Sequence, residues 1–85
     1  MHTLSGVMVS ESKRAAIRRQ YRGLRNDVDK TQLEVEALAR LDAGRYWKIE
    51  NGIVFPTDEE RARLARVLKV DESVLPSERV EAHAS

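Results

Sequence analysis

Residues 31–52 read TQLEVEALARLDAGRYWKIENG and hold two candidate helices joined by a short turn. Thr31 and Glu34 have the spacing of a capping box, in which the threonine hydroxyl accepts from the glutamate amide and the glutamate side chain accepts from the threonine amide. This pattern predicts a helix that begins just after Thr31. We expect that helix to bury three apolar residues: Val35, Leu38 and Ala39.

The second candidate helix is predicted over residues 42–51, after a turn at residues 40–41. Asp42 is a candidate N-cap, because its carboxylate can accept from backbone amides of the first helical turn. Asn51-Gly52 predicts the end of the helix, since glycine readily takes the left-handed conformation that closes many helices. Its inward face is expected to carry Tyr46 and Ile49. Two capped helices joined by a turn of about three residues are the local signature of a helix-turn-helix.

The flanking sequence predicts three more short helices and no strands, so the fold class is all-α. On the N-terminal side, an apolar stripe at helical spacing consists of Ile17, Tyr21, Leu24 and Val28. A neighbouring basic stripe consists of Arg14, Arg18, Arg22 and Arg25. On the C-terminal side, residues 57–60 (TDEE) form a second capping box. A last turn from Asp71 or Glu72 is expected to bring Val74 and Leu75 into the core, which gives five helices.

Length and composition predict one soluble domain. Eighty-five residues allow one core, expected over residues 11–75 between a flexible arm (1–10) and a flexible tail (76–85). The sequence has no cysteine, no apolar run near the roughly 20 residues of a bilayer span and no signal-peptide pattern, which favours the cytoplasm. His2 and His83 lie in opposite tails, and no glycine-rich phosphate loop is present. We therefore expect no metal, no cofactor and no enzyme activity.

The charge of the chain is unevenly distributed, although its net value is only +1. Residues 1–48 hold ten Lys and Arg against six Asp and Glu, whereas residues 49–85 hold five against eight. Residues 13–25 carry six basic side chains and no acid. A basic half of this kind can be an electrostatic footprint for phosphate. A solvated helix face would give the same pattern, so charge alone leaves both interpretations open.

Residues along most of the chain also fall, without a gap, into the pattern of a known family. The central matches are Thr31-Gln32, Val35, Ala39, Leu41 and residues 49–52 (IENG). The outer matches are Ile17, Tyr21, Leu24-Arg25, Pro56-Thr57, Leu64-Ala65, Val67-Leu68, Val70 and Leu75. Over about residues 14–75, the chain thus resembles the lambda-repressor-like family, also called the Cro/repressor or XRE family. The resemblance implies a compact five-helix DNA-binding domain.

Four positions depart from the family pattern. Arg40 stands where the family usually has the turn glycine, so we expect it to take a left-handed or otherwise adjusted conformation. Glu36 replaces a small residue, and is expected either to tilt outward or to loosen packing against the next helix. Gly44 weakens the helix over residues 42–51. The apolar segment 53–55 (Ile53, Val54, Phe55) replaces a loop that is usually polar and basic.

The resemblance implies that the helix over residues 42–51 enters the major groove of DNA. Its candidate contact residues are Ala43, Gly44, Arg45, Trp47 and Lys48. Arg45 and Lys48 share a helix face, and either could donate to guanine O6 and N7. Ala43 could meet a thymine methyl group, and Gly44 could allow close approach to the backbone. Trp47 is expected to be partly exposed, and either stacks on DNA or covers the apolar segment 53–55.

Other residues are expected to support that interface. The resemblance implies a phosphate contact for Gln32, at the start of its helix. Thr31, next to it, is also a predicted DNA-binding residue, and a second phosphate contact is expected for Arg22. The resemblance also implies an internal salt bridge between Arg25 and Glu50, whereas two independent surface charges would be the simpler interpretation. These residues form no catalytic constellation.

The leading functional prediction is a sequence-specific regulator of transcription, a repressor or Cro-like protein from a prokaryote or a phage. Such a domain is expected to bind an inverted-repeat operator as a homodimer. One alternative is the antitoxin of a toxin–antitoxin pair, with residues 77–85 contacting the toxin. Another is a protein-interaction module that kept the fold without binding DNA. The apolar segment 53–55 could contribute to a dimer contact or to a protein partner.

Overall fold

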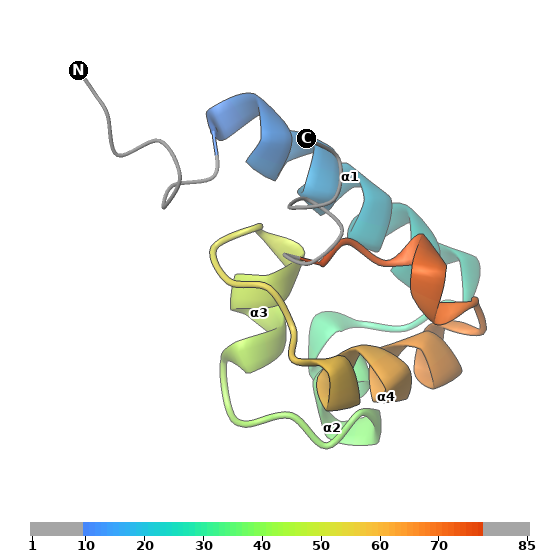
Figure 1. The fold of residues 1–85 in the computed structure, drawn as a ribbon. Coiled ribbons are helices and arrows are strands. Elements are labelled where there is room, and N and C mark those ends of the chain that lie inside the picture. Colours follow the sequence, from blue (N-terminus) through green and yellow to red (C-terminus); the bar gives the residue numbers. More distant parts are fainter. Residues whose placement is uncertain (1–9, 78–85) are drawn as a thin grey trace.

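The computed structural model describes residues 10–77, and all of the predicted arm except Ser10 and most of the predicted tail lie outside these residues. In chain order, the elements are α1 (Glu11–Asp27), α2 (Gln32–Leu38), α3 (Arg45–Glu50), α4 (Asp58–Leu68) and a single 3-10 turn, η1 (Glu72–Val74). Figure 1 shows α1 along one side of the molecule, with α2 and α4 on the other side. Since α3 contacts both α1 and α2, it ties the two sides together. No strand occurs within residues 10–77, so the all-α prediction is confirmed for them.

One continuous core holds the helices together. Tyr21 of α1 and Tyr46 of α3 meet edge to face at its centre, with ring centroids 6.1 Å apart and planes at 88°. This arrangement places the positive edge of one ring against the negative face of the other. The remaining buried apolar residues come from every α-helix and from the segment after η1: Ile17, Val35, Ala39, Ile49, Leu64, Ala65, Leu68 and Leu75.

The helix starts follow the local sequence signals. Both predicted capping boxes are present: Glu34 N donates to Thr31 Oγ1 at 3.1 Å while Thr31 N donates to Glu34 Oε1 at 2.8 Å, and Thr57 and Glu60 form the same pair of bonds. Each box satisfies two amides that a helix start would otherwise leave without a partner. Ser10 caps α1 by accepting from Lys13 N.

The start of α3 differs from the prediction. The helix spans Arg45–Glu50 rather than residues 42–51, and Gly44 is its N-cap residue in place of Asp42. The φ of Gly44 is 78°, a left-handed value that a right-handed helix does not contain. Residues 42–44 therefore form a turn, and the helix begins after them. Gly44 therefore precedes the helix and does not weaken it from inside. The connection between α2 and α3 is correspondingly longer than the predicted turn.

Two burial predictions were wrong. Leu38 is 56% exposed, because the face of α2 that packs on the core passes through Val35 and Ala39. The predicted fifth helix is only the turn η1, in which Val74 is 42% exposed while Leu75 is buried. Ser77, which the sequence pattern assigns to the tail, is also buried, so the packed domain reaches at least to this residue.

The prediction for Arg40 is confirmed. Its φ of 56° is left-handed, and a side chain at this position carries a steric cost that glycine would avoid. The bond from Leu41 N to Glu36 O closes the turn after α2 around this residue. Gly52, after α3, is likewise left-handed with a φ of 73°, as its predicted role in ending the helix requires.

Candidate nucleic-acid interface

Helix α3 has one face in the core and one face in solvent. Tyr46, Ile49 and Glu50 are buried, at 1% exposure or less. Trp47 is 51% exposed, and Lys48 is also exposed. The expected partial exposure of Trp47 is therefore confirmed. This helix presents an aromatic ring and a cation outward from a backbone that is fixed from behind.

The ion pair between Arg25 and Glu50 holds the end of α3 against α1. Arg25 Nε donates to Glu50 Oε1 at 2.9 Å, and Arg25 Nη2 donates to Glu50 Oε2 at 3.0 Å. The side chains are 14% and 1% exposed. Burial opposes ionisation of the Glu50 carboxyl, but the bonds from Arg25 and Gln32 outweigh it, so the pKa of Glu50 is lowered. This is the pair that the resemblance implies, and its geometry is bidentate.

Gln32 belongs to the same network. Its Nε2 donates to Glu50 Oε2 at 2.8 Å, so the side-chain amide that was expected to reach a phosphate is bonded inside the protein. The hydroxyl of neighbouring Thr31 accepts from Glu34 N within the capping box. A phosphate contact by either residue remains a prediction, and the side chain of Gln32 could make it only by sharing or leaving Glu50.

Arg45 makes an ion pair that the sequence pattern does not predict. Its Nε donates to Glu60 Oε2 at 3.0 Å and its Nη2 to Glu60 Oε1 at 2.9 Å, with side-chain exposures of 28% and 15%. Nη2 also lies 3.4 Å from the carbonyl oxygen of Phe55. The bond from Arg45 is the main cause of a lowered pKa of Glu60. Only the capping role of Glu60 was visible in sequence, because its spacing from Thr57 is local and its approach to Arg45 is not.

Glu36 also has a role that the sequence does not reveal. Its Oε1 accepts from Tyr46 N at 3.3 Å, at the start of α3. Gly44 offers no side chain to cap this helix, so a carboxylate from α2 serves one of its first amides instead. Glu36 therefore bridges α2 and α3. Neither the expected outward tilt nor the expected looser packing against α3 describes it fully.

The apolar segment 53–55 divides between core and surface. Val54 and Phe55 are partly buried and pack against the core, whereas Ile53 is 44% exposed. The amides of Ile53 and Val54 both donate to the carbonyl of Lys48, at 2.9 and 3.4 Å, and so fold the segment back onto the end of α3. A dimer contact through Ile53 stays a prediction.

The basic stripe of α1 lies along the edge that borders α3. Arg25 reaches Glu50, and a Cβ added to Gly52 would lie 3.0 Å from Arg14 Cα, so α1 touches both the end of α3 and the residue beyond it. Arg18 and Arg22 continue this row at helical spacing. Arg22 is exposed and Arg18 partly so, and neither pairs with an acid of the described chain.

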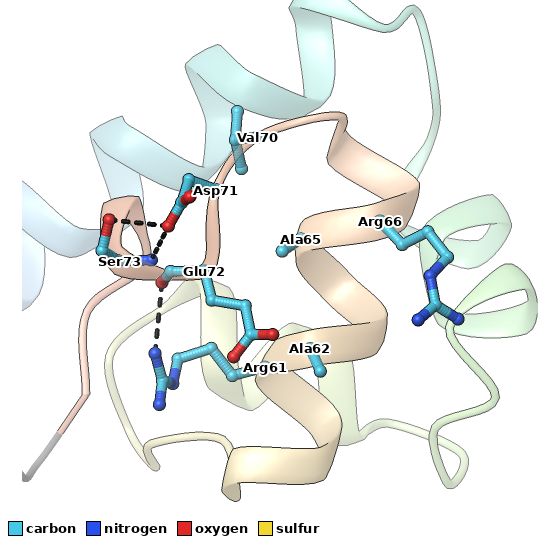
Figure 2. A pocket seen from close by; sticks show the side chains of 8 residues that line it. All are labelled: Arg61, Ala62, Ala65, Arg66, Val70, Asp71, Glu72 and Ser73. Atoms are coloured by element: carbon cyan, nitrogen blue, oxygen red, sulfur yellow. Dashed lines mark hydrogen bonds between the residues drawn. The ribbon is translucent and has the colours of Figure 1, made fainter.

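A shallow groove of about 590 Å³ lies elsewhere, between α4 and η1. Figure 2 shows its lining, which belongs to α4 and to residues 70–73 and includes no residue of α2 or α3. Some of its polar groups bond to one another: Asp71 accepts from the amide and the hydroxyl of Ser73, and Arg61 Nη1 donates to the carbonyl of Glu72. Arg66 also lines the groove and forms no ion pair within the described residues.

No protein-family model, curated protein or solved structure was found that matches the chain. Within residues 10–77, no helix is long and apolar enough to cross a membrane. The same residues contain no group of three or more metal-ligating side chains. Among the predicted contact residues of the helix over residues 42–51, Ala43, Gly44, Trp47 and Lys48 are exposed around the start and outer face of α3.

Proposed function

We propose that this protein is a sequence-specific double-stranded DNA-binding protein of the lambda-repressor-like type, acting as a transcriptional regulator. In this proposal, α2 and α3 are the helix-turn-helix, and α3 enters the major groove. The observation that carries the proposal is that α3 is fixed from behind by buried residues while Trp47 and Lys48 point outward. A rigid helix with exposed long side chains is what reading base edges requires.

The cations around α3 support the proposal. Arg18 and Arg22 lie along the α1 edge next to α3, and Arg40 is exposed in the turn between α2 and α3. None of these three forms an ion pair with an acid within the described residues. Phosphate contacts supply much of the affinity of DNA-binding proteins and set their register on the duplex. We assign this role to these three arginines.

Selection of bound sites from random DNA tests the proposal directly. We expect enrichment of a short motif, arranged as an inverted repeat if the protein binds as a dimer. Arg22→Ala should weaken binding to all sequences about equally and lower the salt slope by about one, because a phosphate carries no sequence information. Arg66→Ala, at an exposed position of α4, is the matched control and should change little. Failure to enrich any motif, together with salt-independent binding, would refute the proposal.

A protein-interaction module is the second candidate, because α2 exposes apolar side chains. Leu33 is 76% exposed and Leu38 56% exposed, on different sides of α2, since five residues separate them. Exposed large apolar side chains are more typical of a protein contact than of a phosphate contact. The antitoxin of a toxin–antitoxin pair is one form of this second candidate, since it would contact a protein partner. Salt dependence separates the candidates, since phosphate contacts release counterions and an apolar contact does not.

A further inference from the structure

The two long donors of α3 differ in what they are free to do. Lys48 is exposed, and no acid of the described chain pairs with it. The guanidinium of Arg45 is held by both carboxylate oxygens of Glu60, at 3.0 and 2.9 Å. A side chain that is bonded twice to a nearby carboxylate must break those bonds before it can reach a base.

The geometry of the guanidinium makes this restriction severe. Recognition of guanine O6 and N7 needs two N–H groups from one edge of the planar fork. Both edges that can form such a fork include Nη2. One N–H of Nη2 goes to Glu60 and the other points at the Phe55 carbonyl, 3.4 Å away. Neither edge of Arg45 can therefore form the guanine fork while these contacts last.

The same contacts connect three parts of the molecule. Arg45 is the first residue of α3, and Glu60 is the third residue of α4, where it also caps the helix by accepting from Thr57 N. Phe55 lies in the segment between the two helices. The side chain of Arg45 thus bonds to the connection between α3 and α4 at Phe55 and to the first turn of α4 at Glu60.

We propose that Arg45 is a positioning residue, which fixes α3 to the start of α4, and that base discrimination belongs to Trp47 and Lys48. The part about DNA rests on the function proposed above. The part about positioning stands on the contacts of Arg45 alone. The two parts are tested by different measurements.

The first measurement compares Arg45→Ala with Lys48→Ala on a selected DNA site and its single-base variants. Arg45→Ala should weaken binding to every sequence by the same factor and leave the preference at each position unchanged within about twofold. Lys48→Ala should lose between about fivefold and about a hundredfold of preference at one position. Loss of preference at one position in Arg45→Ala, with all others kept, would overturn the proposal.

The second measurement releases Arg45 without removing it. Glu60→Gln keeps the capping box, since glutamine serves at this position, but removes the charge that holds the guanidinium. Glu59→Gln makes the same change of net charge at an exposed neighbour and is the control. If Arg45 only fixes α3 to α4 and does not contact DNA, the Glu60→Gln variant should bind DNA no more tightly than the Glu59→Gln variant. Severalfold tighter binding by Glu60→Gln, lost again in the Arg45→Ala background, would show that a freed Arg45 contacts DNA.

A third measurement needs no DNA. In a double-mutant cycle of urea unfolding, Arg45→Ala and Glu60→Gln should show a coupling of about fivefold in the unfolding equilibrium constant. Additive effects would refute the positioning role, whatever the DNA results. If the wild-type protein prefers no DNA sequence, the proposed function and the assignment of Trp47 and Lys48 both fail. The cycle then still decides whether Arg45 holds α3 to α4.

Discussion

The two ends of α3 are held in different ways. At its end, Glu50 is 1% exposed and bonded by Arg25 and Gln32, and Gly52 lies so close to α1 that a Cβ would meet the backbone of Arg14. At its start, Arg45 and Glu60 are more exposed, and a Cβ on Gly44 would meet nothing within 4 Å. The C-terminal end of α3 is therefore part of the core, whereas its start is part of the surface. Substitutions of the same kind should lower the free energy of unfolding more at the C-terminal end than at the start.

The largest effect is expected for Glu50→Ala. It leaves the guanidinium of Arg25 and the amide of Gln32 without their shared acceptor in a buried place. Removing one member of such a pair should lower the free energy of unfolding by about 3–5 kcal/mol, measured by urea denaturation. Glu59→Ala, on the surface of α4, should stay within about 0.5 kcal/mol and serves as the control. Equal losses in the two variants would show that the end of α3 is not anchored through Glu50.

Gly52→Ala should have the next largest effect. Alanine disfavours the left-handed φ of 73°, and its Cβ would lie 3.0 Å from Arg14 Cα, so α1 or α3 must shift. We expect a loss of about 2–4 kcal/mol in the free energy of unfolding. A loss below about 1 kcal/mol would mean that the contact between α3 and α1 is looser than these distances indicate.

Gly44→Ala sharpens the comparison, because it imposes nearly the same backbone strain without a clash. The φ of Gly44 is 78°, and the added Cβ would lie in open space. The loss should be about 1 kcal/mol, due to the backbone alone. Thermal unfolding of both glycine variants in parallel gives the difference directly. If Gly44→Ala were as destabilising as Gly52→Ala, the start of α3 would be as tightly packed as its end.

The smallest effect is expected in the acid dependence of stability. The pKa of Glu50 is lowered from its ordinary value of 4.5. A carboxyl with a lowered pKa contributes stability that is present above the ordinary value and is lost as the pH falls through the lowered one. Between about pH 5 and pH 2, Glu50→Gln should therefore lose less stability than the wild type. Glu59→Gln is the control, and an acid dependence that is the same in all three proteins would contradict this prediction.

Much of the fold could be predicted because its signals are local. Each capping box is a spacing of three residues, and the stripe through Ile17 and Tyr21 follows from the period of the helix. The left-handed conformation of Gly52 follows from the need to end a helix within one or two residues, whereas that of Arg40 was expected from the family resemblance. Such features depend on neighbours in the chain, so the sequence alone determines them.

The errors and omissions arise where distant segments meet. Whether Leu38 is buried depends on which face of α2 packs on the core. The start of α3 at Arg45 is a local exception, since the left-handed Gly44 directly precedes it. Arg25 and Glu50 could be paired only through a family resemblance, since 25 residues separate them. The bond from Glu36 to the start of α3 has no local signature at all.

Arg45 shows most clearly what the sequence determined and what the tertiary structure decided. From the sequence, it is a long cation at the start of an expected recognition helix, on the same face as Lys48. Its charge and its reach are properties of the residue itself. The packing of α4 beside α3 then placed the Glu60 carboxylate within 3.0 Å of its guanidinium. A long side chain takes the nearest opposite charge, and only the arrangement of the helices determines which charge that is.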